Sequence, residues 1–324
     1  MAARKTPAEQ RVNEGFAIEY PPSQRNACTM PDVGVERRRQ AMARYDEAIA
    51  LDPHLAKAYL ARGSAWRRLG DHKRARADLS TALKLGPTEP YDYLRISFGF
   101  EGKKQRGILR AGIRRCRPGS QTHFHLANYL ANLHWYDQRY DLELRALRRL
   151  KRAHPNFSRG NPGAMLALDE GKALRALDRL AAAEQAYRRS LGFAHPLRDL
   201  AATAMIECRI YRGDLDGARQ VLREVGHHLG KLRVAIMRAY LDAVGEQAIA
   251  CPAWLRRKLR TLAETNEVGF FGAVVLWHLG DRDLVEPQLR EKVRRWQANR
   301  LEWGVTFRWE IAYGRALLRQ KAAR

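Results

Sequence analysis

Residues 56–87 contain the pattern that most restricts how this chain can fold. Small and apolar residues recur at helical spacing in two runs: Tyr59, Gly63 and Trp66, and then Ala75, Leu79, Ala82 and Leu85. Gly70 and Asp71 separate the runs as a turn, and Pro87 follows the second run as a helix terminator. The stretch therefore predicts two antiparallel helices. Neither helix can bury its apolar face alone, so the pair requires neighbours of the same kind.

Copies of this pattern recur along the chain. Ala41, Tyr45, Ala48 and Pro53 precede Ala75, Leu79, Ala82 and Pro87 by 34 residues each. Further copies lie at 171–190 and 213–225, and weaker ones at 93–116 and 276–281. Residues 36–300 therefore resemble an array of tetratricopeptide repeats, which are helix-turn-helix units of this length. The resemblance implies an all-α protein, a right-handed α-α solenoid of about seven to eight helix pairs with a C-terminal capping helix.

Composition divides the chain into three predicted regions. Residues 1–35 contain four prolines and little helical periodicity, which predicts an extended or partly ordered arm. Residues 36–300 form the predicted solenoid, and a turn-rich insertion near residues 156–163, NFSRGNPG, is expected to loop out of it. Residues 301–324 are predicted to form an amphipathic helix that covers the apolar face of the last unit, as the end of a solenoid requires.

The charge of the chain predicts the kind of partner. Its 59 lysines and arginines against 35 acidic residues give a net charge of +24. Such an excess favours an anionic partner, whether an acidic protein, a nucleic acid or anionic lipid. No stretch approaches the roughly 18 apolar residues of a membrane span. The amino end has no apolar run of a secretory signal, so we expect a cytoplasmic protein.

No combination of residues predicts catalysis, a metal or a cofactor. The four cysteines stand far apart without CxxC spacing, and burial of Cys116 and Cys208 as core thiols is expected. His123 and His125 lie two residues apart on a predicted helix and face different sides, which is unsuited to a shared metal ion. The sequence therefore predicts a protein that is not an enzyme and carries no cofactor.

The resemblance implies a concave groove lined by the first helix of each pair, which holds an extended peptide or a partner helix. The matching positions are Lys57, Leu60, Ser64, Arg67, Tyr91, Leu94, Arg95, Phe98, His125, Asn128, Tyr129 and Asn132, with Lys172, Thr203 and Glu207 further along. Asn128 and Asn132 lie one helical turn apart, and an amide can both donate to and accept from a peptide bond. Leu60 and Ser64 replace the Lys and Asn of the subgroup that clamps a terminal carboxylate, so such a clamp is not expected.

Basic residues form stripes on the predicted second helices. The candidate residues are Lys73, Arg76, Lys103, Arg106, Arg110, Arg114, Arg145, Arg148, Arg149 and Arg152. Leu144, Leu147 and Leu150 occupy the side opposite the last stripe. In tetratricopeptide arrays second helices stack along the convex surface, which would merge the stripes into one basic ridge. The alternative interpretation is a set of long side chains that only solvate an outer face.

These patterns predict a non-enzymatic scaffold for protein interactions. Its groove would bind a peptide or helix, and its basic convex face an acidic partner. The alternative hypothesis is a protein that binds RNA or DNA without sequence specificity, or a ribonucleoprotein component, through the ridge. A third hypothesis assigns base stacking to Phe98, Tyr129, Trp135 and Tyr136, but no polar code recurs from unit to unit.

Overall fold

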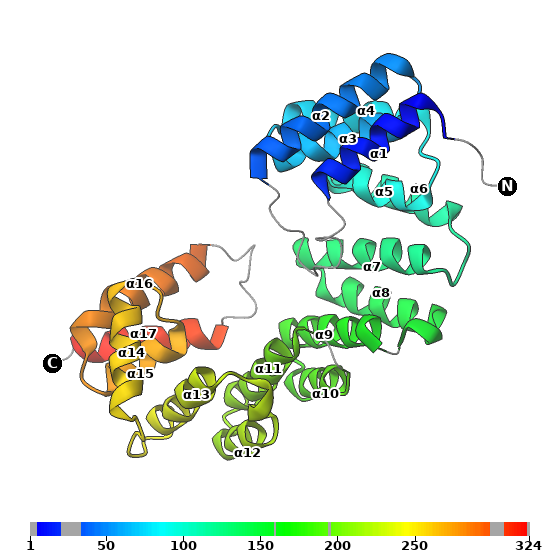
Figure 1. Ribbon diagram of the computed structural model, residues 1–324. Helices are drawn as coiled ribbons and strands as arrows, with labels where there is room; N and C mark the ends of the chain where they lie inside the picture. The colour runs from blue at the N-terminus through cyan, green and yellow to red at the C-terminus, as the bar shows by residue number, and fades with distance from the viewer. Residues whose placement is uncertain (1–4, 21–33, 159, 194–195, 299–307, 323–324) are drawn as a thin grey trace. The chain divides into compact units, whose positions relative to one another are not determined.

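The computed structural model describes residues 5–20, 34–158, 160–193, 196–298 and 308–322 (Figure 1). Within these ranges there are seventeen α-helices and two short 3-10 segments, and no strand. The helices follow one another as the sequence predicts, in pairs joined by short turns. The prediction of an all-α solenoid of helix pairs is therefore confirmed. None of the described helices is long and apolar enough to cross a lipid bilayer.

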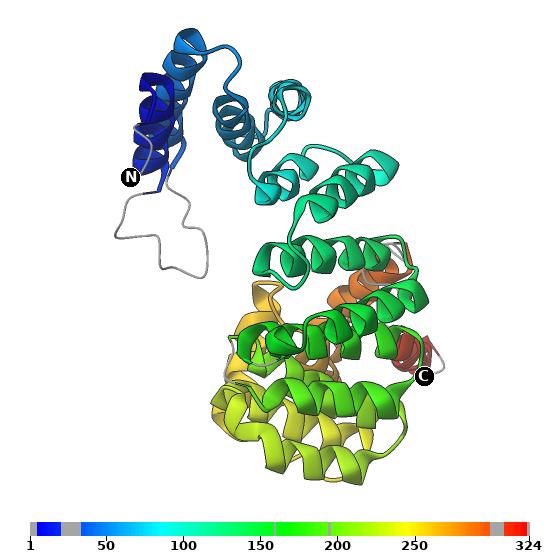
Figure 2. The ribbon, with the colours of Figure 1, turned by 90° about the vertical axis from the view of Figure 1, so that its right-hand side faces the viewer.

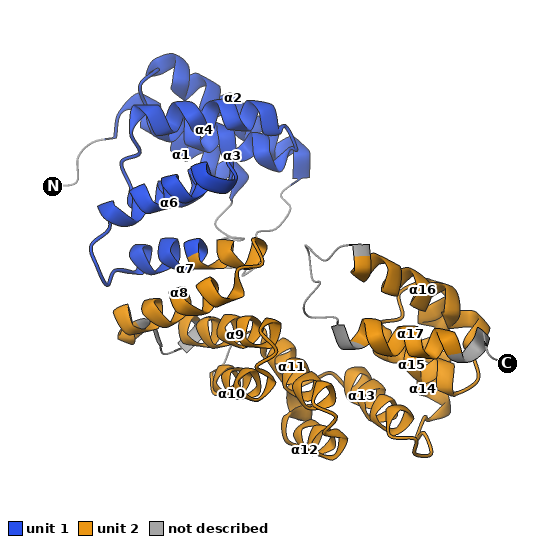
Figure 3. Cartoon of the chain, turned by 180° about the vertical axis from the view of Figure 1, so that it is seen from behind, with its two compact units in different colours: residues 1–130 blue, residues 131–324 orange. Residues whose placement is uncertain are grey.

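The chain divides into two compact units, residues 1–130 (unit 1) and residues 131–324 (unit 2), coloured separately in Figure 3. Unit 1 contains α1 (Pro7–Glu19), α2 (Gly34–Leu51), α3 (Ala56–Arg68), α4 (His72–Leu85), α5 (Pro90–Ser97) and α6 (Gly102–Arg115), and α7 (Gln121–Tyr136) crosses the boundary. Unit 2 contains α8 (Tyr140–Ala153), α9 (Gly160–Ala176), α10 (Leu180–Leu191), α11 (Arg198–Tyr211), α12 (Leu215–Val225), α13 (Lys231–Val244), α14 (Ala253–Glu264), α15 (Phe270–His278), α16 (Arg282–Ala298) and α17 (Arg308–Ala322).

A glycine on the first helix of a pair lets the second helix approach closely. A Cβ atom on Gly63 of α3 would lie 3.0 Å from Cγ of Leu79 on α4, and one on Gly171 of α9 would lie 2.5 Å from Cε1 of Tyr187 on α10. Leu79 and Tyr187 are fully buried at these contacts. Close packing of this kind leaves no room for a larger residue, which explains why the sequence pattern alternates small and bulky positions.

The predicted Gly-Asp turns form as expected. Gly70 and Gly213 have φ angles of +84° and +74°, which glycine adopts without strain. The following aspartates cap the next helices, because Asp71 Oδ1 accepts from the amide of Arg74 at 2.9 Å and Asp214 Oδ1 accepts from the amide of Gly217 at 2.9 Å. Each turn therefore ends one helix and begins the next.

The amino end differs from the sequence prediction. An extended or partly ordered arm was expected over residues 1–35, and Pro7–Glu19 form helix α1. A capping box begins it, since Thr6 Oγ1 accepts from the Glu9 amide and Glu9 accepts from the Thr6 amide. Helix α1 packs against α2 and supplies the first helix of the first pair (Figure 2, dark blue). Residues 7–19 are therefore helical and not extended, and residues 21–33 lie outside the described part.

The predicted insertion near residues 156–163 and the predicted C-terminal cap both contain helical structure. The insertion near residues 156–163 does not simply loop out, because Pro155–Ser158 form a 3-10 turn and α9 already begins at Gly160. Helix α17 falls within the predicted C-terminal cap, packs against α16 and buries Leu317. Helix α17 also contacts α11 through a hydrogen bond from Tyr211 to Glu310.

Candidate binding faces

In unit 1, arginine and aromatic side chains alternate over the first helices of the pairs. We call this set the arginine–aromatic face; it consists of Phe16, Tyr20, Arg67, Arg68, Arg95, Phe98 and Tyr129. The Arg68 Cζ atom lies 4.9 Å from the centre of the Tyr20 ring, and Arg95 Cζ lies 5.3 Å from that of Phe16. These contacts join α3 and α5 to α1.

The same arrangement continues from α3 to α7. The Arg67 Cζ atom lies 5.3 Å from the centre of the Phe98 ring, and the ring centres of Phe98 and Tyr129 are 5.1 Å apart at an interplanar angle of 86°. Edge-to-face rings and a stacked guanidinium are both favourable geometries. Arg67, Phe98 and Tyr129 therefore form a continuous strip across three first helices.

This face carries a positive excess and is partly exposed, because Phe98 is exposed and its other residues are half-buried. Phe98 is 38% exposed and the neighbouring Tyr91 is 46% exposed, both high values for large apolar side chains. Asp92 is the carboxylate nearest to Arg95, at 3.7 Å, and burial raises the pKa of Asp92 despite this cation. Glu19 of α1 is buried and accepts hydrogen bonds from Tyr45 and Arg68 at 3.0 and 3.1 Å.

The residues predicted to line the groove divide into two groups. Arg67, Arg95 and Tyr129 lie on the arginine–aromatic face, whereas Leu60 is 1% exposed and belongs to the core. Leu60 therefore cannot contact a ligand, because its side chain is removed from solvent, and its place in the predicted groove is wrong. The half-buried Ser64 donates its hydroxyl proton to the Leu60 carbonyl at 2.8 Å.

The remaining groove candidates of unit 1 lie beside the arginine–aromatic face. Half-buried Lys57 of α3 lies close enough to Asp92 of α5 to lower the pKa of that carboxyl, against the larger effect of burial. The rings of Tyr91 and His125 meet edge to face at 6.4 Å, and burial lowers the pKa of His125. Both positions border the arginine–aromatic face.

Helix α7 carries the two asparagines predicted to hold a peptide. The Oδ1 atoms of Asn128 and Asn132 are each buried and accept no hydrogen bond within the described part of the chain. A buried amide oxygen without a donor is costly, so such groups call for a partner. The role of these amides in peptide binding stays a prediction.

In unit 2, helix α17 contacts the first helices α11 and α15. The carboxylate of Glu310, which is 2% exposed, accepts a hydrogen bond from the Tyr211 hydroxyl of α11. Arg175 of α9 donates to the same hydroxyl at 3.1 Å and forms an ion pair with Glu207. Burial and the charge of Glu207 raise the pKa of Glu310 to about 7.

Further contacts hold α17 against α15 and the core of unit 2. The Tyr313 hydroxyl lies 3.1 Å from Nε2 of His278 on α15, and Leu317 joins the buried core. The candidate groove residues here bond within the unit: Lys172 pairs with Asp169 at 3.1 Å, and the Thr203 hydroxyl donates to the Asp199 carbonyl at 2.8 Å. Glu207 is held by Arg175, so these positions are already satisfied.

The basic stripes are mostly exposed, and they differ in how many of their cations pair with a carboxylate. On α4 and α6, Lys73, Arg76, Lys103, Arg110 and Arg114 are exposed, and no ion pair with a described carboxylate involves them. Arg106 is half-buried. The merging of the stripes on α4, α6 and α8 into one ridge stays a prediction.

On α8, two of the four arginines of the stripe have acidic partners. Arg145 pairs with Asp141, and Arg148 Nε lies 3.6 Å from Glu170. Arg149 and Arg152 are exposed, and Leu144, Leu147 and Leu150 are buried on the opposite side as predicted. The α8 stripe is thus less positive than its sequence suggests.

The structure adds functional candidates that sequence reasoning missed. Phe16 and Tyr20 were placed in an extended arm, although they stand one helical turn apart after the capping signal of Thr6 and Glu9. Glu310 gave no local signal, because its partners lie about a hundred residues earlier in the chain. In the described residues, no group of three or more His, Cys, Asp or Glu side chains is arranged to hold a metal ion.

Comparison with known proteins supports the fold. No family model and no curated protein matches the sequence. Among solved structures, yeast Tom70 is similar over 99% of this chain and 66% of its own, with 11% identity and a TM-score of 0.50. A human IFIT1 dimer with m7Gppp-AAAA is similar over 99% and 73%, at 14% identity and a TM-score of 0.47. The type IV pilus biogenesis factor PilW is similar over 84% and 100%, at 14% identity and a TM-score of 0.42. The chain has a tetratricopeptide-like helical repeat fold.

Proposed function

We propose that this protein is a non-enzymatic interaction scaffold whose arginine–aromatic face binds an acidic segment of a partner protein. The observation that carries the proposal is the strip of half-buried Arg67 on α3, exposed Phe98 at the end of α5 and half-buried Tyr129 on α7. Arginine and tyrosine are enriched among residues that dominate the energy of protein interfaces. The strip therefore has the composition of a binding surface.

The geometry of the strip determines which partner it suits. A guanidinium stacked on a ring keeps its N–H edge free to donate to a carboxylate, and its side chain is already ordered before binding. Phe98 beside it offers an apolar surface that is 38% exposed. A partner segment that alternates carboxylates with apolar or aromatic side chains satisfies both requirements.

Two further features support a peptide or helix as the ligand. The Oδ1 atom of Asn128, one residue before Tyr129 on the same helix, is buried and accepts no hydrogen bond within the described part of the chain, and a rotation of this side chain would let it accept from a donor of the partner. The net charge of +24 attracts acidic chains over long range and raises the association rate. A cytoplasmic location agrees with this function and stays a prediction.

The test uses the full chain and a labelled helical peptide that carries Glu and Phe on one face, with binding measured by fluorescence anisotropy. Arg67→Ala and Phe98→Ala should each weaken binding by about 10-fold, the usual size of a central interface contact. Arg110→Ala is the matched control, because Arg110 is an exposed arginine of α6 outside the strip. Equal losses in Arg67→Ala and Arg110→Ala would contradict the proposal and leave only nonspecific attraction.

The second candidate function is binding of RNA or DNA by the basic stripes. The exposed cations of α6, Lys103, Arg110 and Arg114, favour it, because phosphate backbones are bound by such cations without sequence specificity. Affinity for nucleic acid should fall steeply with salt, whereas binding through apolar anchors should fall little. Charge reversal of Lys103, Arg110 and Arg114 together, and separately of Arg145, Arg148 and Arg149, would abolish that binding while leaving peptide binding to the strip.

A further inference from the structure

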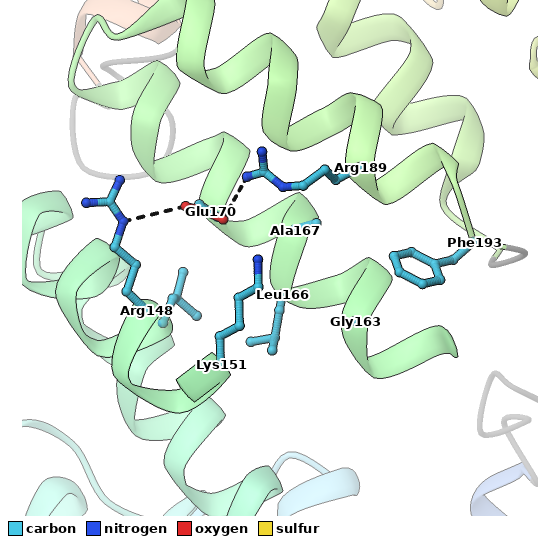
Figure 4. A pocket seen from close by; sticks show the side chains of 9 residues that line it. Arg148, Lys151, Gly163, Leu166, Ala167, Glu170, Arg189 and Phe193 are labelled. Atoms are coloured by element: carbon cyan, nitrogen blue, oxygen red, sulfur yellow. Dashed lines mark hydrogen bonds and ion pairs between the residues drawn. The ribbon is translucent and has the colours of Figure 1, made fainter. Parts of the chain in front are cut away.

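Unit 2 contains a pocket that shares a single lining residue, Arg148, with the predicted sites. It has a volume of about 290 Å³ and lies among α8, α9 and the end of α10 (Figure 4). Leu147, Leu166, Ala167 and Phe193 form apolar walls, and Gly163 leaves one side without a side chain. A cavity of roughly 150 Å³ holds benzene, so this volume accommodates one ring or branched alkyl group together with a polar end.

Three cations surround the pocket. Arg148 and Lys151 come from α8 and Arg189 from α10, and all three side chains line the pocket. The single carboxylate, Glu170, lies 3.6 Å from Arg148 Nε and 3.0 Å from Arg189 Nη2, and Figure 4 shows it between the two guanidinium groups. Glu170 is only 14% exposed in its side chain, so it orients both arginines and neutralises one charge.

Lys151 supplies the charge that remains. Its side chain lines the pocket, and no ion pair joins it to a carboxylate in the described ranges. Arg148 and Arg189 also keep donors that Glu170 does not use, because a guanidinium has five N–H groups. An anionic group at the mouth would therefore meet an unpaired ammonium and two pre-oriented guanidinium groups.

We infer that this pocket binds an organic anion in which a ring or branched alkyl group is attached close to a carboxylate. The apolar walls would bury the ring, and Lys151 with the two arginines would hold the carboxylate. Such a group occurs both in small free acids and at the C-terminal residue of a peptide. The site lies wholly in unit 2 and does not depend on the arginine–aromatic face of unit 1.

The probe is N-acetyl-L-phenylalanine, with binding to the full chain followed by ligand-observed NMR. For a ligand of about fifteen heavy atoms, a dissociation constant of about 1 mM is expected. The neutral amide of the same compound should bind about 10-fold more weakly, and acetate, which lacks the ring, should not bind measurably. Equal binding of the acid and its amide would overturn the inference, as would no binding of the acid at about ten times that concentration.

Two variants of matched charge locate the site. Lys151→Gln should weaken binding of the acid by about 5-fold, the effect of one partly exposed ion pair. Arg152→Gln removes the same charge from the next residue of α8, which is exposed and does not line the pocket, and should leave binding unchanged. Phe193→Ala should weaken the acid and the amide alike. A loss in Arg152→Gln equal to that in Lys151→Gln would place the binding elsewhere and refute the inference.

Two peptides distinguish a small free acid from a protein C-terminus as the natural ligand. A short peptide that ends in phenylalanine with a free carboxylate is compared with the same peptide amidated at that end. Tighter binding of the free-carboxylate peptide than of N-acetyl-L-phenylalanine identifies a protein C-terminus, and the reverse order identifies a small acid. Both results support the pocket, whereas two peptides that bind at least as tightly as N-acetyl-L-phenylalanine, and equally well with a free or an amidated end, contradict it.

Discussion

The first helices of the two units present different surfaces. In unit 1, the arginines of α3 and α5 stack on rings, and Tyr91 and Phe98 remain exposed. In unit 2, α17 packs against α16, Glu310 bonds to Tyr211 of α11, and the side chains of Glu310 and Leu317 are both buried. One repeat geometry thus gives an open face in one unit and a face covered by the chain itself in the other.

Helix α17 in unit 2 indicates which kind of helix can cover the first helices of a unit. Helix α17 presents a carboxylate to the Tyr211 hydroxyl beside Arg175, and an apolar side chain to the core. Arginine and aromatic rings are also the components of the open face in unit 1. This parallel supports an amphipathic helix with acidic residues as the partner of unit 1, and it makes α17 the natural point at which to test the comparison.

The largest effect is expected from separating α17 from unit 2. Leu317→Asp places a charge in a position that is 1% exposed, which should reduce the free energy of unfolding by about 3–5 kcal/mol. Hydrogen exchange of the α17 amides should accelerate strongly, while exchange in α3 and α5 stays unchanged. Ala312→Asp introduces the same charge at an exposed position of the same helix and should cost less than about 1 kcal/mol. Equal destabilisation by the two variants would show that α17 is not held through this core.

The next effect concerns the residue that anchors α1 in unit 1. Glu19 lies 3.0 Å from the Tyr45 hydroxyl, 3.1 Å from Arg68 and 3.7 Å from Arg38. Glu19→Ala removes the buried carboxylate that these three groups share and should cost about 2–4 kcal/mol, measured by chemical denaturation. Glu19→Gln keeps an acceptor and should cost less. Because α1 carries Phe16 and Tyr20, the Ala variant should also weaken peptide binding.

A smaller effect is expected from pH, and its largest part should arise in unit 2. Burial raises the pKa of Glu143 from 4.5 to about 8, with a further contribution from Asp169, and the pKa of Glu310 is raised to about 7. The folded form therefore holds these protons more tightly than the unfolded chain. The resulting stability is complete below about pH 4.5 and is lost as pH rises to about 8.

Hydrogen exchange can separate the two units in this experiment. Protection of α8, α9 and α17 should decrease between pH 5 and pH 8, after correction for intrinsic exchange, by about 1–3 kcal/mol. Glu143→Gln should flatten this dependence and raise stability at pH 8, because the amide does not ionise. A decrease of the same size in Glu143→Gln and the unmodified protein would contradict the assignment.

The sequence predicted the repeat units because their signal is local. Gly63 and Leu79, or Gly171 and Tyr187, recur at fixed spacing, and the Gly70-Asp71 turn combines a left-handed glycine with a helix cap. Helix α1 was not predicted because residues 1–35 contain four prolines and little helical periodicity. At the first position of a helix, proline loses no hydrogen bond and fits the required φ angle, so it begins α1 instead.

The candidate site was predicted only in part. Arg67, Arg95 and Tyr129 follow from the repeat register, but Leu60 in the same register is buried because an apolar side chain gains more from the core than from solvent. The pairing of Arg95 with Phe16 and of Tyr211 with Glu310 joins segments far apart in the chain. Periodicity carries no information about such contacts, so only the structure could supply them.

The smallest predicted effect distinguishes charge from stacking on the open face. Arg67→Lys keeps the positive charge but removes the planar group that lies 5.3 Å from the Phe98 ring. Stability should change by less than about 0.5 kcal/mol, because Arg67 is only half-buried and its ring contact is partly exposed. Affinity for the acidic peptide should fall by about 3- to 5-fold, since the ammonium is neither ordered by the ring nor able to donate in a fork. Arg110→Lys on α6, which contacts no ring in the described part, is the control and should bind as the unmodified protein does. If Arg67→Lys bound the peptide with full affinity, the open face of unit 1 would act through charge alone. The two units would then differ only in that α17 covers the face of unit 2, and not in how a face binds its occupant.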